Sequence, residues 1–105
     1  MTMYIHFEES PFGLEFEWDD RKWRTNIEKH GIDFEDAIGI FDGPVFVRRS
    51  DRNEEKRWVA IGGLYGRVIA VVYTVRLSVY RIISAREGRN DERRNFENRK
   101  AAPGG

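Results

Sequence analysis

The amino-acid sequence predicts an α+β fold, with two N-terminal helices packed on one face of an antiparallel sheet and a C-terminal helix after the sheet. Apolar residues between positions 19 and 42 recur at the three- and four-residue spacing of amphipathic helices. From Val45 to about Arg86 they instead alternate, or form short runs that polar turns interrupt, which is typical of β-strands. Helices that are separate along the chain from the sheet strands favour an α+β domain.

Before the helices, the sequence predicts one short strand. Leu14, Phe16 and Trp18 alternate with glutamates, so one face of this strand is expected to be buried. The segment 1–14 is expected to be loose or to form an edge, with a turn at 10–13.

The two helices are predicted from their caps. Asp19 or Asp20 caps a helix that runs to about His30, and Gly31 supplies its left-handed stop. Asp33 is a favourable N-cap for a second helix, which Asp42-Gly43-Pro44 ends. The core face of this second helix consists of Phe34, Ala37, Ile38 and Phe41.

Strands and one further helix fill the rest of the chain. The predicted strands cover 45–47, 57–62, 67–75 and 79–84, and the last helix runs from Asn90 or Asp91 to about Arg99. With the helices gathered on one face, the other face of the sheet is left open. It must then be covered by solvent, a ligand or a partner.

Length and composition predict a single small domain. The chain has 105 residues, 40% of them apolar and 34% charged, which allows a modest core. We expect the packed part to cover about 16–97, with loose segments at 1–14 and 100–105. There is no cysteine, so no disulfide framework or thiolate chemistry is expected. The chain lacks a long apolar run and a signal-peptide pattern, so we expect a cytoplasmic protein without membrane contact.

The net charge of zero conceals a division between the two halves of the chain. Residues 1–44 contain 4 Lys or Arg and 11 Asp or Glu, a balance of −7. Residues 45–105 contain 14 basic and 7 acidic residues, a balance of +7, and twelve of the basic residues are arginine. Arginine is suited to planar, bidentate phosphate contacts, so one interpretation is that this half binds an anionic partner. The other interpretation is that the charges only form surface salt bridges that are unevenly distributed along the chain.

The first helix carries one group of candidate binding residues. Lys22, Asn26, Lys29 and His30 have the spacing of a shared helix face, where they could contact phosphates. Alternatively, the lysines solvate the helix and His30 has a capping role at its end.

The predicted strands carry a second group of candidates. Arg57, Arg81 and Arg86 lie in or beside apolar strands, where an arginine is costly unless its donors are satisfied. A phosphate would satisfy them, and Ser84 beside Arg86 could contribute. In a regular strand, however, Arg81 points away from the face of Ser84, so the group converges only if this strand ends or bulges near Ser84. Alternatively, Arg81 is a structural anchor that is ion-paired to Asp19, Asp20, Glu35 or Asp36.

Motifs for several common chemistries are absent from the sequence. It contains no GxSxG, Walker or HExxH motif and no cluster of Cys and His, so nothing supports a serine hydrolase, a nucleotide-binding loop or a zinc centre. With two histidines in all, we expect no metal and no other cofactor.

Several short motifs follow one another in order along residues 16–97. They are Phe16-Glu17-Trp18-Asp19, Lys22, Asn26, Lys29-His30-Gly31, Phe34, Ala37, Phe41, Arg57-Trp58, Gly62, Arg81-Ile82-Ile83-Ser84-Ala85-Arg86, and Glu92-Arg93 with Phe96. Together they resemble the BrnT family of toxins. Phe96 stands where that family usually has Tyr, so any role of that hydroxyl is lost, and Gly88 stands where it often has Ala.

The resemblance implies a RelE-like fold and a ribonuclease that stops translation and is neutralised by a BrnA-type antitoxin. It also implies that the complex binds its own promoter DNA, with the antitoxin supplying the DNA-reading element. Two other hypotheses remain open. One is a non-catalytic toxin-fold subunit that binds antitoxin and operator DNA, and the other is a structural protein whose arginines only hold the fold.

RNA cleavage by such a protein would need no metal, because the ribose 2′-hydroxyl can attack the adjacent phosphate in line. Arg57, Arg81 and Arg86 are then the candidates for stabilising charge on the phosphoryl oxygens. His30 is the candidate general base or acid, because an imidazole titrates near neutral pH. The candidates for RNA contact are Lys22, Asn26, Lys29 and Ser84.

Overall fold

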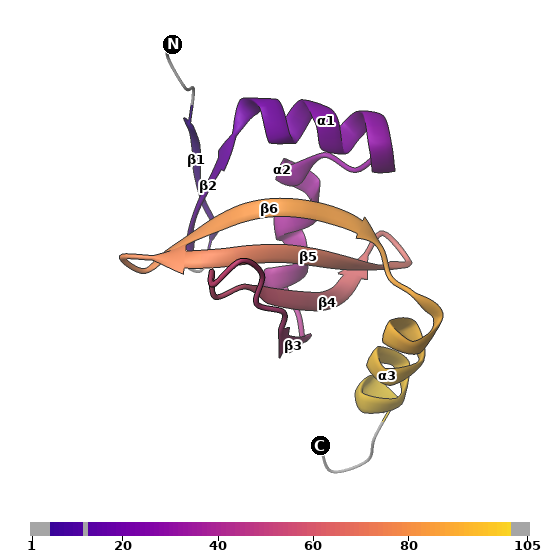
Figure 1. The fold of residues 1–105 in the computed structure, drawn as a ribbon. Helices are drawn as coiled ribbons and strands as arrows, with labels where there is room; N and C mark the ends of the chain where they lie inside the picture. The colour runs from indigo at the N-terminus through magenta and orange to yellow at the C-terminus, as the bar shows by residue number, and fades with distance from the viewer. Residues whose placement is uncertain (1–4, 12, 102–105) are drawn as a thin grey trace.

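The computed structural model describes residues 5–11 and 13–101, with side chains up to residue 99. The predicted loose ends at 1–4 and 102–105, and position 12 of the predicted turn, lie outside the described residues. The elements follow the chain as β1 (Ile5–Glu9), β2 (Glu15–Asp19), α1 (Asp20–His30), α2 (Phe34–Ala37), η1 (Ile38–Asp42), β3 (Val45–Arg49), β4 (Trp58–Leu64), β5 (Arg67–Arg76), β6 (Val79–Glu87) and α3 (Asn90–Ala101). The predicted α+β class is confirmed (Figure 1).

The strands form one mixed sheet in the order β1-β2-β6-β5-β4-β3. The prediction of a purely antiparallel sheet is wrong at one junction, because β2 and β6 pair in parallel, 15–17 against 79–81. A parallel pair needs a long crossover, and here three helices (α1, α2 and η1) and three strands separate its members along the chain. β1, in the segment expected to be loose or an edge, pairs antiparallel with β2 and forms an edge of the sheet.

Helix α1 has the caps that the sequence predicts. The Asp19 carboxylate accepts a hydrogen bond from the Arg21 N–H at 2.7 Å, and Gly31 ends the helix with a φ of 67°. Figure 1 shows α1 beyond β6. Asn26 joins the two elements, donating to the Ala85 carbonyl at 2.9 Å and accepting from the Ala85 N–H at 3.0 Å. α1 therefore continues the sheet sideways at β6, which corrects the expectation that it packs flat on one face.

The second predicted helix has two parts. Asp33 caps α2, as expected, by accepting from the Glu35 N–H at 2.9 Å, and after Ala37 the chain tightens into the 3₁₀ helix η1. η1 packs closely on β4, because a Cβ built on Gly62 would lie 2.8 Å from the Cβ of Ile40. Glycine at this position allows the close approach of helix and strand.

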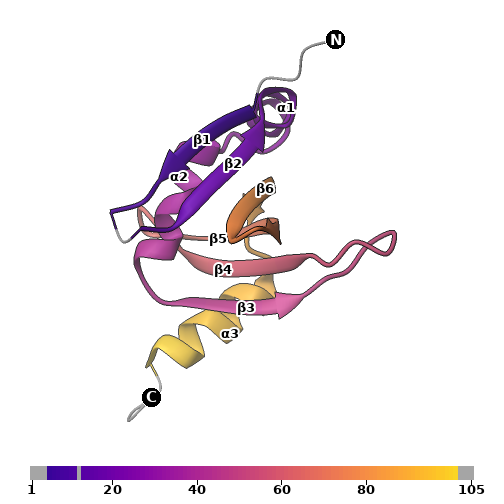
Figure 2. The same ribbon diagram turned by 90° about the vertical axis from the view of Figure 1, so that its left-hand side faces the viewer.

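The two faces of the sheet carry separate hydrophobic clusters. On one face, α2 and η1 cover a cluster that includes Phe16, Trp18, Phe34, Ile40, Ile69, Tyr73 and Ile82. On the other face, Phe96 of α3 packs on Val59, Ile61, Val68 and Ala70. The face that the sequence analysis left open is therefore partly covered by α3, which lies near β3 and β4 in both ribbon views (Figure 2). No helix within the described residues is long and apolar enough to cross a membrane.

Candidate active site in an arginine-lined cleft

A bulge in β6 brings three predicted site residues onto one face of the sheet. Two consecutive residues of β5 pair with Ser84 and Ile82, so Ile83 is an extra residue in β6. In a regular strand, without a bulge, alternation would place Arg81 on the face opposite to Ser84 and Arg86. The bulge shifts the alternation by one position, and all three side chains lie on the face that carries α3. The condition set by the sequence for convergence is therefore met.

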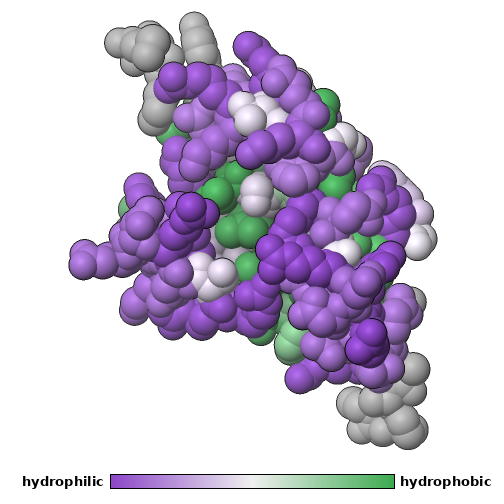
Figure 3. All heavy atoms as spheres, turned by 45° about the vertical axis from the view of Figure 1, so that its right-hand side comes forward, coloured by the Kyte–Doolittle hydropathy of each residue, from purple (hydrophilic) through white to green (hydrophobic). Residues whose placement is uncertain are grey.

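Two adjoining hollows on this face share Arg57 and Ile83, and we call them together the arginine cleft. The first, of about 420 Å³, has the cationic lining groups Lys22, Arg57, Arg76 and Arg81. The second, of about 470 Å³, has the polar and charged lining groups Arg48, Ser50, Asp51, Arg52, Arg57, Ser84, Arg86 and Arg89. Viewed as in Figure 3, hydrophilic side chains dominate the surface of the molecule and surround a smaller apolar area in a hollow.

Arg81 is half-buried in the first hollow and is weakly paired. Its Nη1 lies 3.5 Å from Oε2 of Glu17, on the neighbouring strand β2. Glu17 is not among the acidic partners that the sequence analysis proposed for Arg81. A guanidinium has five donors, so this single long contact leaves most of them available to an anion in the cleft.

Arg57 lies where the two hollows meet. Its Nε donates to Oε1 of Glu55 at 2.7 Å, and its backbone N–H donates to Asp51 at 3.2 Å. These contacts hold the residue just before β4 begins, with one guanidinium edge still unpaired among the contacts of the described residues.

Arg86 is held much more firmly than Arg81. It donates to both carboxylate oxygens of Glu92 in α3, at 2.7 and 3.0 Å. Arg48 and the backbone N–H of Arg89 donate to the same carboxylate at 2.9 and 2.8 Å. These contacts, with Arg86 as the largest cause, lower the pKa of Glu92 to about 2 although burial opposes the shift. Glu92 therefore anchors α3 to the sheet and fixes the orientation of Arg86.

The residues of the predicted shared face on α1 do not all reach the arginine cleft. Lys22 lines the arginine cleft, whereas Lys29 and His30 are exposed and do not line it. His30 lies eight residues after Lys22, about 12 Å along the helix axis. Asn26 is 4% exposed and its amide is fully bonded to the backbone of Ile32 and Ala85. Asn26 is thus a structural residue, which corrects its placement on an exposed face.

One group in the described part of the chain has metal-ligand chemistry. His6, Glu8 and Glu35 offer ligand atoms within 4.8 Å of one another. The ring of His6 stacks on Trp18 at 4.6 Å, so this group lies on the face covered by α2, opposite to the arginine cleft. The His6 contact lowers the pKa of Glu8, and the Glu8 contact raises that of Glu35.

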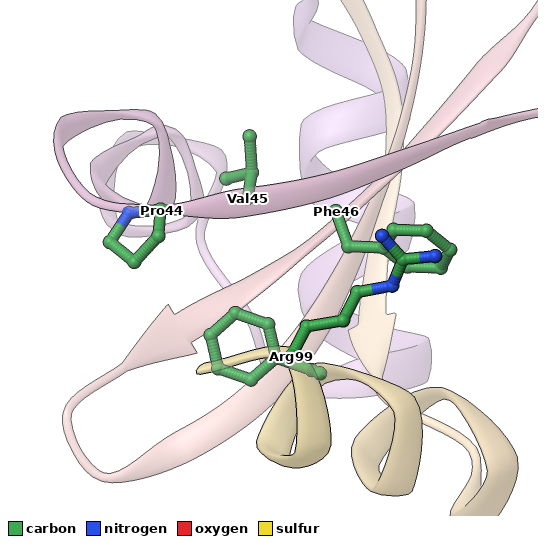
Figure 4. Close-up of a pocket in the computed structure, with 5 residues that line it drawn as sticks. Pro44, Val45, Phe46 and Arg99 are labelled. Atoms are coloured by element: carbon green, nitrogen blue, oxygen red, sulfur yellow. The ribbon is translucent and has the colours of Figure 1, made fainter. Parts of the chain in front are cut away.

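A smaller apolar pocket lies between β3 and α3. Pro44, Val45, Phe46, Phe96 and Arg99 line a cavity of about 220 Å³. The guanidinium of Arg99 covers the ring of Phe46 at 4.2 Å from its centroid (Figure 4). No predicted site residue contributes to this pocket.

Three residues at this site were not predicted from the sequence: Glu55, Arg48 and Glu92. Glu92 was visible in one of the motifs, but its contacts with two arginines depend on how α3 docks. Glu55 and Arg48 gave no signal, because a single charged residue in a polar loop or an edge strand is ordinary.

Comparison with known proteins identifies the family. The family model described as "Ribonuclease toxin, BrnT, of type II toxin-antitoxin system" matches residues 18–92. A search of curated proteins gave no match. The matched segment runs from the end of β2 to the first turn of α3 and includes Lys22, Arg57, Arg81 and Arg86. The chain therefore belongs to the BrnT family of ribonuclease toxins from type II toxin–antitoxin systems.

Proposed function

We propose that the protein is a metal-independent endoribonuclease that cleaves RNA in the arginine cleft and thereby inhibits translation. The observation that carries this proposal is the meeting of Lys22, Arg57 and Arg81 in one hollow. Lys22 comes from α1, Arg57 directly precedes β4, and Arg81 lies in β6. Cations that face one space repel each other, and a phosphate placed between them reduces this cost.

The residues of the arginine cleft have distinct roles in this mechanism. Arg81 and Arg57 bind the non-bridging oxygens of the scissile phosphate, where negative charge grows in the transition state. Arg86, fixed by Glu92, and Ser84 bind a neighbouring phosphate in the second hollow. Lys22 contacts the RNA backbone from α1.

Two predicted residues lie outside the cleft and have a peripheral role in the proposal. Lys29 and His30 are exposed farther along α1. They would extend RNA contact beyond the cleavage site, as cations near phosphates add affinity without sequence specificity. His30 is not placed to transfer a proton within the cleft.

The partner of the toxin is proposed from the family. A type II toxin has a protein antitoxin, and we propose a BrnA-type antitoxin that covers the arginine cleft with acidic side chains. The same complex would bind promoter DNA through the antitoxin. A RelE-like fold for the toxin is part of the same proposal.

Two variants of Arg81 test the proposed function. Purified toxin, freed from its antitoxin, is incubated with RNA in excess EDTA, and the products are followed on gels. We expect cleavage by the unmodified chain, and a loss of at least about 100-fold for Arg81→Ala. Arg81→Lys should also lose most activity, because an ammonium cannot copy the bidentate fork. Arg94→Ala, which removes an equal charge from exposed α3, is the matched control.

The results separate the competing hypotheses. An unmodified chain that binds RNA and antitoxin but cleaves nothing would support the non-catalytic subunit. Unfolding of Arg81→Ala, measured by circular dichroism, would show that Arg81 anchors the fold. Cleavage that EDTA abolishes would contradict the metal-independent mechanism.

A further inference from the structure

We infer that Glu55 is the catalytic base of this site, the group that takes the proton from the attacking ribose 2′-hydroxyl. This inference rests on the proposed function. It adds a residue to the site that neither the sequence motifs nor the family description assigns.

The loop between β3 and β4, which projects from the sheet in Figure 2, has a defined shape around Glu55. The backbones of Arg52 and Glu55 bond to each other in both directions, at 3.0 and 2.9 Å. Asn53 and Glu54 between them have φ angles of 51° and 64°, which is the geometry of a tight two-residue turn. The turn therefore fixes where the Glu55 side chain enters the arginine cleft.

Glu55 is the acidic group that lines the hollow of Lys22, Arg57 and Arg81, among the residues that the structure describes there. Its Oε1 accepts from Nε of Arg57 at 2.7 Å. Its Oε2 lies 3.7 Å from Nη2 of Arg76, beyond hydrogen-bond distance. Oε2 thus keeps lone pairs that can accept a proton, while Oε1 is linked directly to a phosphate-binding arginine.

Glu17 contacts Arg81 but does not line either hollow of the cleft. Two other carboxylates near the cleft are occupied. Asp51 lines the second hollow, but Arg49 donates to both of its oxygens, at 2.9 and 2.6 Å. Glu92 is buried and accepts from Arg86 and Arg48. In both carboxylates each oxygen accepts a hydrogen bond, whereas Oε2 of Glu55 has, among the described residues, only the longer ion pair with Arg76.

The proposed step balances in atoms and protons. The 2′-hydroxyl gives its proton to the Glu55 carboxylate as the O2′–P bond forms and the P–O5′ bond breaks. Water supplies a proton to the leaving 5′ oxygen, and the resulting hydroxide takes the proton from Glu55. The products are a 2′,3′-cyclic phosphate and a 5′-hydroxyl. Arg57 and Arg81 stabilise the charge on the phosphoryl oxygens throughout.

The step gives the reaction a distinctive pH dependence. The hydrogen bond from Arg57 lowers the pKa of Glu55 below its ordinary value of 4.5. The base is therefore ionised throughout the neutral range, and cleavage should decline in acid only below pH 4.5. A histidine base would instead make cleavage decline near the ordinary histidine pKa of about 6.5.

The experiment compares Glu55→Gln with Glu54→Gln in single-turnover cleavage of a short RNA, with RNA affinity measured separately. Glu54 is the adjacent residue, is exposed and does not line the cleft, so it is a matched control. Glutamine can still accept from Arg57 but cannot take the proton. We expect Glu55→Gln to cleave about 100-fold or more slowly with RNA affinity kept within a few-fold, and Glu54→Gln to match the unmodified chain.

The pH profile and one further variant complete the test. The unmodified chain should keep its cleavage rate from neutral pH down to about pH 5, and His30→Ala should show the same profile. If Glu55→Gln cleaves at the normal rate while Arg81→Ala is inactive, Glu55 is not the base and the proposed function stands. If the unmodified chain does not cleave RNA at all, the proposed function itself fails. A loss in Glu55→Gln that comes only from weaker RNA binding would also overturn the inference.

Discussion

Asn26 shows how much a single side chain contributes to this fold. From within a polar helix, its amide donates to the carbonyls of Ile32 and Ala85 and accepts from the Ala85 N–H. The Asn26 side chain thereby pairs with the free edge of β6, as a neighbouring strand would. This contact holds the α1 residues, including Lys22, beside the arginine cleft.

We predict that Asn26→Ala destabilises the protein by about 2–4 kcal/mol, because several buried backbone groups lose their partner. The measurement is urea unfolding followed by circular dichroism. Lys29→Ala, at an exposed position of the same helix, should change the free energy of unfolding by less than about 0.5 kcal/mol. If both variants change the free energy of unfolding equally, the hydrogen bonds of Asn26 do not stabilise the fold.

Among the elements, α3 depends on few contacts for its position. Its sequence is strongly polar, and its buried side chains among the described residues are Glu92 and Phe96. Phe96 covers an apolar part of the sheet, while Glu92 pairs with Arg86 and Arg48. A helix held by one apolar contact and one ionic network should respond to pH.

We predict that acid weakens the docking of α3. The pKa of Glu92 is lowered to about 2 in the fold, from 4.5, so the ionised form contributes stability that is present above pH 4.5 and is lost as pH falls toward 2. By linkage this contribution is at most about 3 kcal/mol. Glu92→Gln should therefore be less stable than the unmodified chain near neutral pH.

Urea unfolding at several pH values tests this prediction. The difference in the free energy of unfolding between the unmodified chain and Glu92→Gln should shrink steadily as pH falls below 4.5. Glu97→Gln, exposed on the same helix, should show little difference at any pH. If Glu92→Gln lowers the free energy of unfolding by the same amount at every pH, ionisation of Glu92 is not what stabilises α3.

At the scale of the whole molecule, cations from the basic second half of the chain gather at the arginine cleft. The basic second half supplies most of the cations of the arginine cleft, and Lys22 from the acidic first half joins them. The cleft is therefore the natural surface for an acidic partner, whether that partner is RNA or a protein that competes with RNA.

We predict that the complex with the antitoxin weakens as salt rises, because exposed charge pairs are screened over about 8–10 Å at physiological ionic strength. Kd should increase by at least about tenfold between about 0.1 M and 1 M NaCl, measured by calorimetry. Arg94→Ala, outside the cleft, should show the same salt dependence as the unmodified chain. A Kd that salt does not change would instead indicate a mainly apolar interface, for which the pocket beside Phe46 is a candidate.

The sequence by itself determined most of the elements and the family, although it predicted neither β1 as a strand nor the change from α2 to the 3₁₀ helix η1. Asp19, Gly31 and Asp33 act through neighbouring backbone groups, so local spacing was enough to predict the helix caps. The alternation of apolar residues likewise predicted the strands, because side chains in a strand point to opposite faces in turn.

Only the tertiary structure decided how these parts form a site. The parallel pairing of β2 with β6 joins residues more than sixty positions apart, and no local pattern records such a pairing. Nothing in the sequence pattern marks Ile83 as the extra residue of a bulge. The bulge nevertheless places Arg81 on the face of Ser84 and Arg86. Asn26 is buried because its amide meets the free edge of β6. Glu55 and Glu92 take their roles from the arginines that the fold places beside them, Arg57 and Arg86. Most of these are contacts between distant segments, and such contacts are set by packing and charge in three dimensions.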